Sequence, residues 1–164
     1  MFSVFKNINR LAGKSKLLDF FAIFCAEYLV YLLIVFLFFW ATFTNNWQIF
    51  VYPVVSALFA AFAVGKFIHI FYRRKRPAFL ENAKVLIHVP QNPSFPSRHA
   101  SILFGISFYL LFYNFPLAII FIVCSCLVGI ARVFCGVHWF SDIATGAIVG
   151  FASSQLIYYL VNYL

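Results

Sequence analysis

The chain has 164 residues, of which 65% are hydrophobic, 22% aromatic and only 10% charged, with a formal net charge of +8. This composition excludes an ordinary soluble globule, in which about a quarter of the residues are charged. Nucleic acid is not an expected partner, because 24 Phe residues leave little solvated surface on which a duplex could lie. The sequence therefore predicts an all-α fold, a polytopic membrane helical bundle that forms one domain over residues 1–164.

The first part of the chain contains a basic segment and then an apolar one. Residues 2–16 fit a short amphipathic helix at the lipid headgroups, and a disordered basic leader explains them equally well. Residues 17–40 form the first predicted span, since a hydrocarbon core requires about 20 apolar residues. Glu27 lies inside this span, where a carboxylate is costly, so we expect it to face the bundle, protonated or paired with a base.

The second predicted span, residues 48–72, follows a turn at Asn45-Asn46 and ends in a basic cluster. Arg74 and Lys75 in this cluster fit an interfacial anchor. Four other basic side chains recur at steps of three, four and three, which predicts one stripe along the helix before Pro77 ends it. They are Lys66, His69, Arg73 and Arg76.

Residues 78–98 form a loop rich in Pro, Asn and Ser. In its last segment, FPSRHA, Ser97 is placed to cap a helix that begins near Arg98, and His99 lies in the first turn. Such a helix start can bind an anion, because free backbone N–H groups, a hydroxyl and an arginine meet there. A serine before a helix is more often only a cap.

Three further spans are predicted at residues 100–113, 117–132 and 140–164. In the last of them, Gly146 and Gly150 form a GxxxG pattern, which favours close approach of another helix. We expect that neighbour to belong to the same chain.

The segment Ala131–Asp142 carries the strongest chemical signal. If the chain is helical from His138, Asp142 lies one turn later on the same face, where its carboxylate can orient the imidazole. A nucleophilic histidine is prepared in this way. The alternative, a buried polar pair with only a structural role, is about as frequent.

Five spans bring the N-terminus, residues 73–98 and the 132–138 connection to one membrane face. All 12 Lys and Arg residues and all four His residues then lie on or near that face. Because three separate polar segments converge, we expect one site there.

A phosphate group bound at this site needs several fixed cations, and the planar arginine fork suits two phosphate oxygens at once. Of two histidines, one can attack phosphorus while the other protonates the leaving oxygen and later activates water. The sequence has no Walker loop, no HExxH motif and no carboxylate cluster for magnesium, so we expect no metal and no cofactor. The candidate catalytic residues are His138 as nucleophile, His99 as acid and base, and Asp142 as the orienting carboxylate; the candidate phosphate-binding residues are Arg76, Ser97, Arg132, Lys66, His69 and Arg98.

Three motifs carry a family resemblance. Arg76-Pro77, PSRH at residues 96–99 and R-x5-H-x3-D at residues 132–142 resemble the signature motifs of the type 2 phosphatidic acid phosphatase superfamily. Within it, the small size and the NPSFPSRHA context are most similar to bacterial undecaprenyl-diphosphate phosphatases of the bacitracin-resistance type. The resemblance implies a phosphohistidine mechanism with the same roles for His138, His99 and Asp142.

Three positions depart from the family pattern. His69 occupies the place of the usual motif 1 lysine, for which Lys66, one turn earlier, can substitute. Ala131 replaces a serine before the motif 3 arginine. Arg98 stands where glycine or aspartate is common, and it can contact the second phosphate of a diphosphate.

The expected function is therefore hydrolysis of a lipid phosphate, foremost undecaprenyl diphosphate to undecaprenyl phosphate and inorganic phosphate. Alternatives are a lipid A, phosphatidylglycerophosphate or phosphatidic acid phosphatase, and a non-enzymatic transporter that binds phospholipid head groups. The only partners expected are the lipid substrate and the bilayer. The basic N-terminus argues for a cytoplasmic site by the positive-inside rule, whereas the resemblance implies the outer face of a bacterial inner membrane, which we follow.

Overall fold

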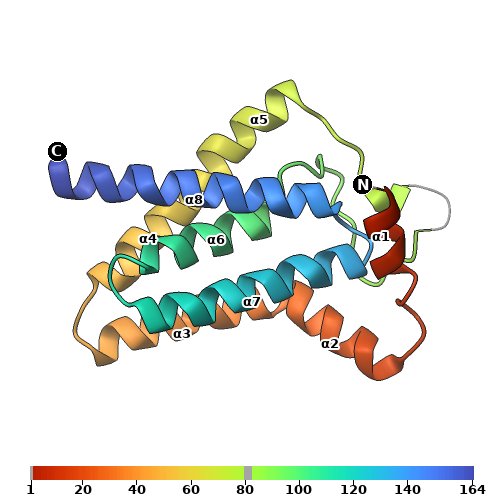
Figure 1. Cartoon of the computed structure of the whole chain (residues 1–164), viewed down its shortest axis with the longest axis horizontal. Coiled ribbons are helices and arrows are strands. Elements are labelled where there is room, and N and C mark those ends of the chain that lie inside the picture. Colours follow the sequence, from red (N-terminus) through yellow and green to blue (C-terminus); the bar gives the residue numbers. More distant parts are fainter. Residues whose placement is uncertain (1, 80–82) are drawn as a thin grey trace.

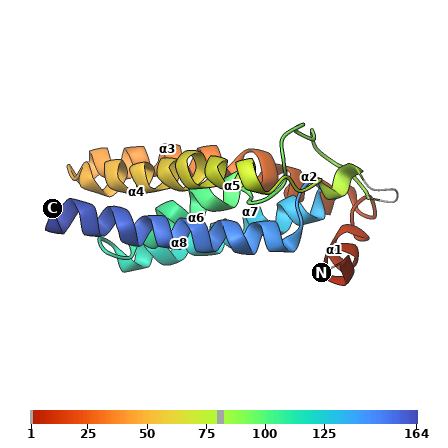
Figure 2. The same cartoon turned by 90° about the horizontal axis from the view of Figure 1, so that it is seen from above.

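The computed structural model describes residues 2–79 and 83–164, and these residues form a helical bundle (Figures 1 and 2). The result confirms the predicted all-α class. In chain order the elements are α1 (Phe2–Asn9), α2 (Lys16–Glu27), α3 (Leu29–Phe43), α4 (Gln48–Leu58), a π-helical turn η1 (Phe59–Val64), α5 (Gly65–Phe71), a 3-10 turn η2 (Pro77–Phe79), α6 (Arg98–Leu110), α7 (Phe115–Phe134) and α8 (Phe140–Tyr163).

The two ends of the bundle differ in chemistry. Figure 1 shows α1, the segment before α6 and the α7–α8 connection gathered at one end. The α3–α4 turn, the α6–α7 turn and the C-terminus lie at the other. The polar segments therefore converge as the sequence predicted.

Within residues 2–79 and 83–164, three helical stretches are long and apolar enough to cross a membrane: Gln48–Phe71, Phe115–Phe134 and Phe140–Tyr163. The pair α2 and α3 makes a fourth if it is taken as one span, although it is bent by 52°. Helix α6, with 13 residues, is shorter than these spans, and its side chains at Leu103, Ile106 and Leu110 are fully buried.

The first predicted span, residues 17–40, is not one continuous helix, since it breaks at Tyr28 into α2 and α3. The Arg132 side chain lies at the break, where Nη1 donates a hydrogen bond of 3.0 Å to the carbonyl of Ala26. It also lies 3.5 Å from Oε1 of Glu27. The expected pairing of Glu27 with a base is thus confirmed, and a polar partner for the opened turn explains how the bend is tolerated.

The continuous helical stripe predicted before Pro77 was also wrong. Helix α5 ends at Phe71, so Lys66 and His69 are helical while Arg73 and Arg76 lie in an extended segment beyond it. Four successive cations repel one another in a helix, and a residue before proline is driven to an extended conformation.

Helices α6 and α8 pack backbone to backbone through the predicted glycine pattern. A Cβ on Gly150 would lie 2.6 Å from the amide nitrogen of Gly105, and one on Gly146 would lie 2.7 Å from Cβ of Ala100. These contacts confirm that the GxxxG face serves a neighbour within the chain, and they hold the start of α6 against the start of α8.

The N-terminal segment is helical, as one of the two alternatives predicted, but it packs on protein. Phe5 of α1 is buried, and its ring lies 5.1 Å from the ring of Trp139. The side chain of Asn9 donates hydrogen bonds of 2.8 Å to the carbonyls of both Lys84 and Phe134. Helix α1 thereby joins the segment after η2 to the end of α7.

Candidate active site

Residues 135–139 form the short connection between α7 and α8, which we call the catalytic loop. All five residues are buried. Gly136 adopts φ of 80°, and the carbonyl of Lys84 occupies the space that a Cβ would need, so only glycine fits there. The amide of Leu86 donates a hydrogen bond to the carbonyl of Cys135, which connects the catalytic loop to the segment between η2 and α6.

His138 lies in this loop and is 2% exposed. Its Nδ1 is 3.4 Å from Oδ2 of Asp142, four residues further on, although the contact is not aligned as a hydrogen bond in this structure. The expected pairing is present, but the chain is not helical from His138, since α8 begins at Phe140. The same Oδ2 accepts a bond of 2.9 Å from the amide of Trp139. Asp142 therefore lies on the Nδ1 side of the ring, and Nε2 is the nitrogen that does not face the carboxylate.

The environment keeps His138 neutral. Burial lowers its pKa from 6.5 to about 4, and the charges of Arg132 and Arg76 act in the same direction, while Asp142 opposes them. A neutral imidazole has a free lone pair on one nitrogen, which is what a nucleophile requires.

Arg76 faces this nitrogen and is 3% exposed. Its Nη1 lies 3.0 Å from Nε2 of His138 and donates a hydrogen bond of 3.0 Å to the carbonyl of Val137. Nε and Nη2 donate to the backbone carbonyl and the side-chain oxygen of Asn92. Burial and the charge of Arg132 lower the pKa of Arg76 to about 10, so the group is still a cation at neutral pH.

Helix α6 brings His99 to the same place. Its Nε2 lies 3.5 Å from Nη1 of Arg132. His99 and His138 line one small cavity of about 20 Å³. Its other lining residues are three arginines, one asparagine and three prolines: Arg76, Arg98, Arg132, Asn92, Pro90, Pro93 and Pro96. We call it the inner cavity. It places both imidazoles among three guanidinium groups.

Ser97 is the residue before α6, but its hydroxyl does not form the predicted cap. The side chain is fully buried, and Oγ has no hydrogen-bond partner among the residues that the structure describes. Its backbone amide instead donates to the carbonyl of Asp142 over 3.1 Å. Ser97 is therefore the N-cap residue of a helix that begins at Arg98, as predicted, but the side-chain hydrogen bond expected of a serine cap is missing.

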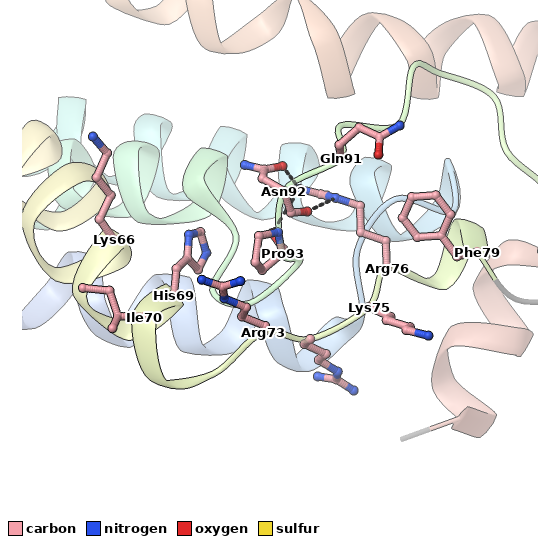
Figure 3. Close-up of a pocket in the computed structure, with 11 residues that line it drawn as sticks. Lys66, His69, Ile70, Arg73, Lys75, Arg76, Phe79, Gln91, Asn92 and Pro93 are labelled. Atoms are coloured by element: carbon pink, nitrogen blue, oxygen red, sulfur yellow. Dashed lines mark hydrogen bonds between the residues drawn. The ribbon is translucent and has the colours of Figure 1, made fainter.

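Lys66 and His69 do not line the inner cavity. They line a larger one of about 430 Å³, together with Arg73, Arg76, Asn92 and others (Figure 3). We call it the outer basic pocket. Five of the six predicted phosphate-binding residues are thus divided between the two cavities, with Arg76 bordering both, and Ser97 lines neither.

The prediction that Arg74 anchors the chain at the membrane interface was wrong. Instead of anchoring at the interface, its Nη1 lies 3.0 Å from Oδ1 of Asp142 and donates to Oγ of Ser141. Its guanidinium also stacks over the Trp139 ring at 4.9 Å. The sequence carries no local signal for this pair, because the partner carboxylate lies 68 residues further along the chain.

The PAP2 superfamily matches residues 50–164 of the chain. Over 157 residues the chain is 31% identical to the "bacitracin transport permease protein BcrC" of Bacillus licheniformis, covering 94% of this chain and 77% of the relative. Over 150 residues it is 25% identical to the "undecaprenyl-diphosphatase BcrC" of Bacillus subtilis (strain 168), covering 90% of this chain and 77% of the relative.

Two solved structures share the fold. One is LpxE of Aquifex aeolicus, with a TM-score of 0.72 and 24% identity over 96% of this chain and 93% of that one. The other is a transmembrane PAP2-type phosphatidylglycerolphosphate phosphatase of Bacillus subtilis, with a TM-score of 0.61 and 21% identity over 99% of this chain and 86% of that one. The motif resemblance is thereby confirmed: the chain belongs to the PAP2 superfamily, as a PAP2-type membrane lipid phosphatase homologous to the BcrC proteins.

Proposed function

We propose that this protein hydrolyses undecaprenyl diphosphate to undecaprenyl phosphate and inorganic phosphate through a phosphohistidine. The observation that carries the proposal is the inner cavity, where His138 and His99 lie among Arg76, Arg98 and Arg132. The identity of 25% to an undecaprenyl-diphosphatase supports the choice of lipid. The site would act at the outer face of a bacterial inner membrane.

In the first step, Nε2 of His138 attacks the terminal phosphorus, the bond to the bridging oxygen breaks, and that oxygen leaves with undecaprenyl phosphate. His99 donates a proton to the leaving oxygen. Asp142, on the Nδ1 side at 3.4 Å, stabilises the positive charge that develops on the attacking ring.

In the second step, His99, now neutral, removes a proton from water, and the resulting hydroxide attacks the phosphohistidine. The P–N bond breaks, inorganic phosphate leaves, and His138 returns to its starting form. The guanidinium groups of Arg76 and Arg132 stabilise the charge on the transferring phosphoryl group, which is the main catalytic contribution in such reactions. For phosphate to enter, the contact of 3.0 Å between Arg76 and Nε2 of His138 must open.

The test is the variant His138→Ala, assayed for phosphate release from undecaprenyl diphosphate. We expect a loss of at least about 10³-fold in kcat, because nothing else in the site can replace the nucleophile. His88→Ala is the matched control, since His88 is exposed and lines neither cavity. Retained activity in a folded His138→Ala protein would contradict the mechanism and favour a protein that only binds head groups.

The substrate is tested separately, by assaying the wild type against undecaprenyl diphosphate, phosphatidylglycerophosphate and lipid A. We expect the highest kcat/KM for the diphosphate. A higher value for either of the other lipids would contradict the substrate while leaving the reaction class in place.

A further inference from the structure

The outer basic pocket lies next to the inner cavity and has the larger volume, about 430 Å³ against about 20 Å³. Figure 3 shows Lys66 and His69 on α5, Arg73 beyond the end of the helix, and Asn92 hydrogen-bonded to Arg76. Arg76, Asn92 and Pro93 border both cavities. A ligand held in the inner cavity can therefore extend past Arg76 into the outer pocket.

The lining of the outer basic pocket is strongly cationic. Among the residues that the structure describes, five Lys or Arg residues and His69 line it, and no Asp or Glu residue does. Within the described part of the chain, neither Lys66 nor Arg73 forms an ion pair, and both are exposed. Cations gathered without acidic partners repel one another, and an anion bound between them relieves that repulsion.

His69 adds a polar group directed to the loop before α6. Its Nε2 is buried and has no hydrogen-bond partner among the described residues, although the carbonyls of Phe95 and Pro96 lie close to the ring. A buried polar atom without a partner is costly unless a ligand or water completes it.

We infer that the outer basic pocket binds the second phosphate of a lipid diphosphate, while the inner cavity holds the phosphate that is transferred. The inference rests on the proposed function and extends it from the reaction to substrate selection. The inner cavity, at about 20 Å³, has the space of roughly one water molecule and must open to admit even the transferred phosphate, whereas the outer basic pocket, at about 430 Å³, already has room for a second one. A second phosphate that extends past Arg76 would meet Arg73, His69 and Lys66 there.

This arrangement divides the work of the cations. Arg76, Arg98 and Arg132 contact the transferred phosphate whatever else the substrate carries. Lys66 and Arg73 line only the outer basic pocket. Removing either charge should therefore weaken the binding of a diphosphate and leave the binding of a single phosphate unchanged.

The experiment compares methylenediphosphonate, which cannot be hydrolysed, with orthophosphate as inhibitors of lipid hydrolysis. For Lys66→Gln and for Arg73→Gln we expect Ki for methylenediphosphonate to rise about tenfold, because a charge-assisted hydrogen bond is lost. Ki for orthophosphate should stay within about twofold of the wild type. Lys14→Gln is the control, an exposed lysine that lines neither cavity.

An equal rise of Ki for both inhibitors, or no change for either, would overturn the inference. Because both side chains are exposed, the variants should fold, and their melting temperatures in detergent should match that of the wild type.

The same two ligands are then titrated calorimetrically into His138→Ala protein, whose binding does not depend on catalysis. If the wild type releases phosphate from no lipid, the proposed function fails. The inference about the outer basic pocket would still hold if methylenediphosphonate bound more tightly than orthophosphate and Arg73→Gln removed this difference in affinity. If hydrolysis is observed but Arg73→Gln leaves this difference unchanged, the outer pocket is wrong and the proposed function stands.

Discussion

At the scale of single residues, the candidate site depends on how one carboxylate is held. Asp142 is fully buried and accepts bonds at both oxygens, from Trp139 at Oδ2 and from Arg74 at Oδ1. The pair with Arg74 offsets the charge that Asp142 presents to His138. We therefore regard Arg74 as a positioning residue, which acts on the nucleophile only through Asp142.

For Arg74→Gln we expect kcat to fall about 10²-fold, because the carboxylate is no longer fixed on the Nδ1 side of His138. The freed charge of Asp142 also stabilises the imidazolium, so the pKa of His138 rises from about 4. More of the nucleophile is then protonated in mild acid, and the acid limb of kcat/KM moves to higher pH. The measurement is kcat/KM against pH for wild type and variant with one lipid, so that titration of the substrate phosphate cancels.

Arg74→Lys is the control for this prediction. It retains the cation without the planar fork and should recover the acid limb of the wild type with part of kcat. If Arg74→Gln lowered kcat/KM at every pH but left the midpoint of the acid limb unchanged, Arg74 would have only a structural role.

At the scale of elements, the contact between α6 and α8 joins His99 to the catalytic loop. The two backbones approach so closely at Gly105 and Gly150 that no side chain fits between them. Small residues allow such packing in a membrane, where van der Waals contact replaces the hydrophobic effect as the source of helix association.

We expect Gly150→Leu to lower the melting temperature in detergent and to abolish most of the activity. The new Cβ would lie 2.6 Å from the amide nitrogen of Gly105 and 2.9 Å from the carbonyl carbon of Phe104, and neither backbone atom can rotate away. Overpacking of this kind costs about 1–3 kcal/mol. It also moves the start of α6, and His99 with it, away from His138.

Ala152→Leu is the matched change, since Ala152 is exposed on the same helix. It should leave both the melting temperature and the activity near those of the wild type. If the two variants behaved alike, close packing of α6 on α8 would not be what positions His99.

At the scale of the whole molecule, the charges mark one end of the bundle as the reaction end. The PAP2 match begins at residue 50, yet the segment before it takes part in the architecture of that end. Asn9 binds the carbonyl of Phe134 immediately before the catalytic loop, and Phe5 packs on Trp139 inside it. Part of the basic charge at this end belongs to the cavities, which weakens the positive-inside rule as a guide to orientation.

Following the family resemblance, we expect the end of the bundle that carries the candidate site to lie at the outer face of the membrane. A cysteine introduced as His88→Cys, in the exposed segment before α6, should react with a membrane-impermeant maleimide in intact protoplasts. The control is Asn46→Cys in the exposed α3–α4 turn at the opposite end, which should react only after the membrane is permeabilised. The reverse pattern of labelling would place the site on the cytoplasmic face.

Much of this protein is determined by the sequence alone. Long apolar runs must become helices in lipid, because no other single segment satisfies its own backbone hydrogen bonds there. The count of those runs then places the three motifs at one end of the bundle. The spacing of four residues also predicted that Asp142 would lie close to His138, although His138 precedes the helix that the prediction assumed. The GxxxG spacing of Gly146 and Gly150 predicted a close helix neighbour, which the structure contains.

Tertiary structure decided the rest, since contacts between distant segments carry no local signature. The bend at Tyr28 follows from a guanidinium that reaches α2 from α7, more than a hundred residues later. The end of α5 at Phe71 turned a predicted helical stripe into two sets of cations, one at each cavity. The ion pair of Arg74 with Asp142 also depends on tertiary structure, because it forms only where the extended segment packs against the start of α8. Whether an arginine anchors a helix at the membrane interface or pairs with a carboxylate depends on which residues lie next to it in space.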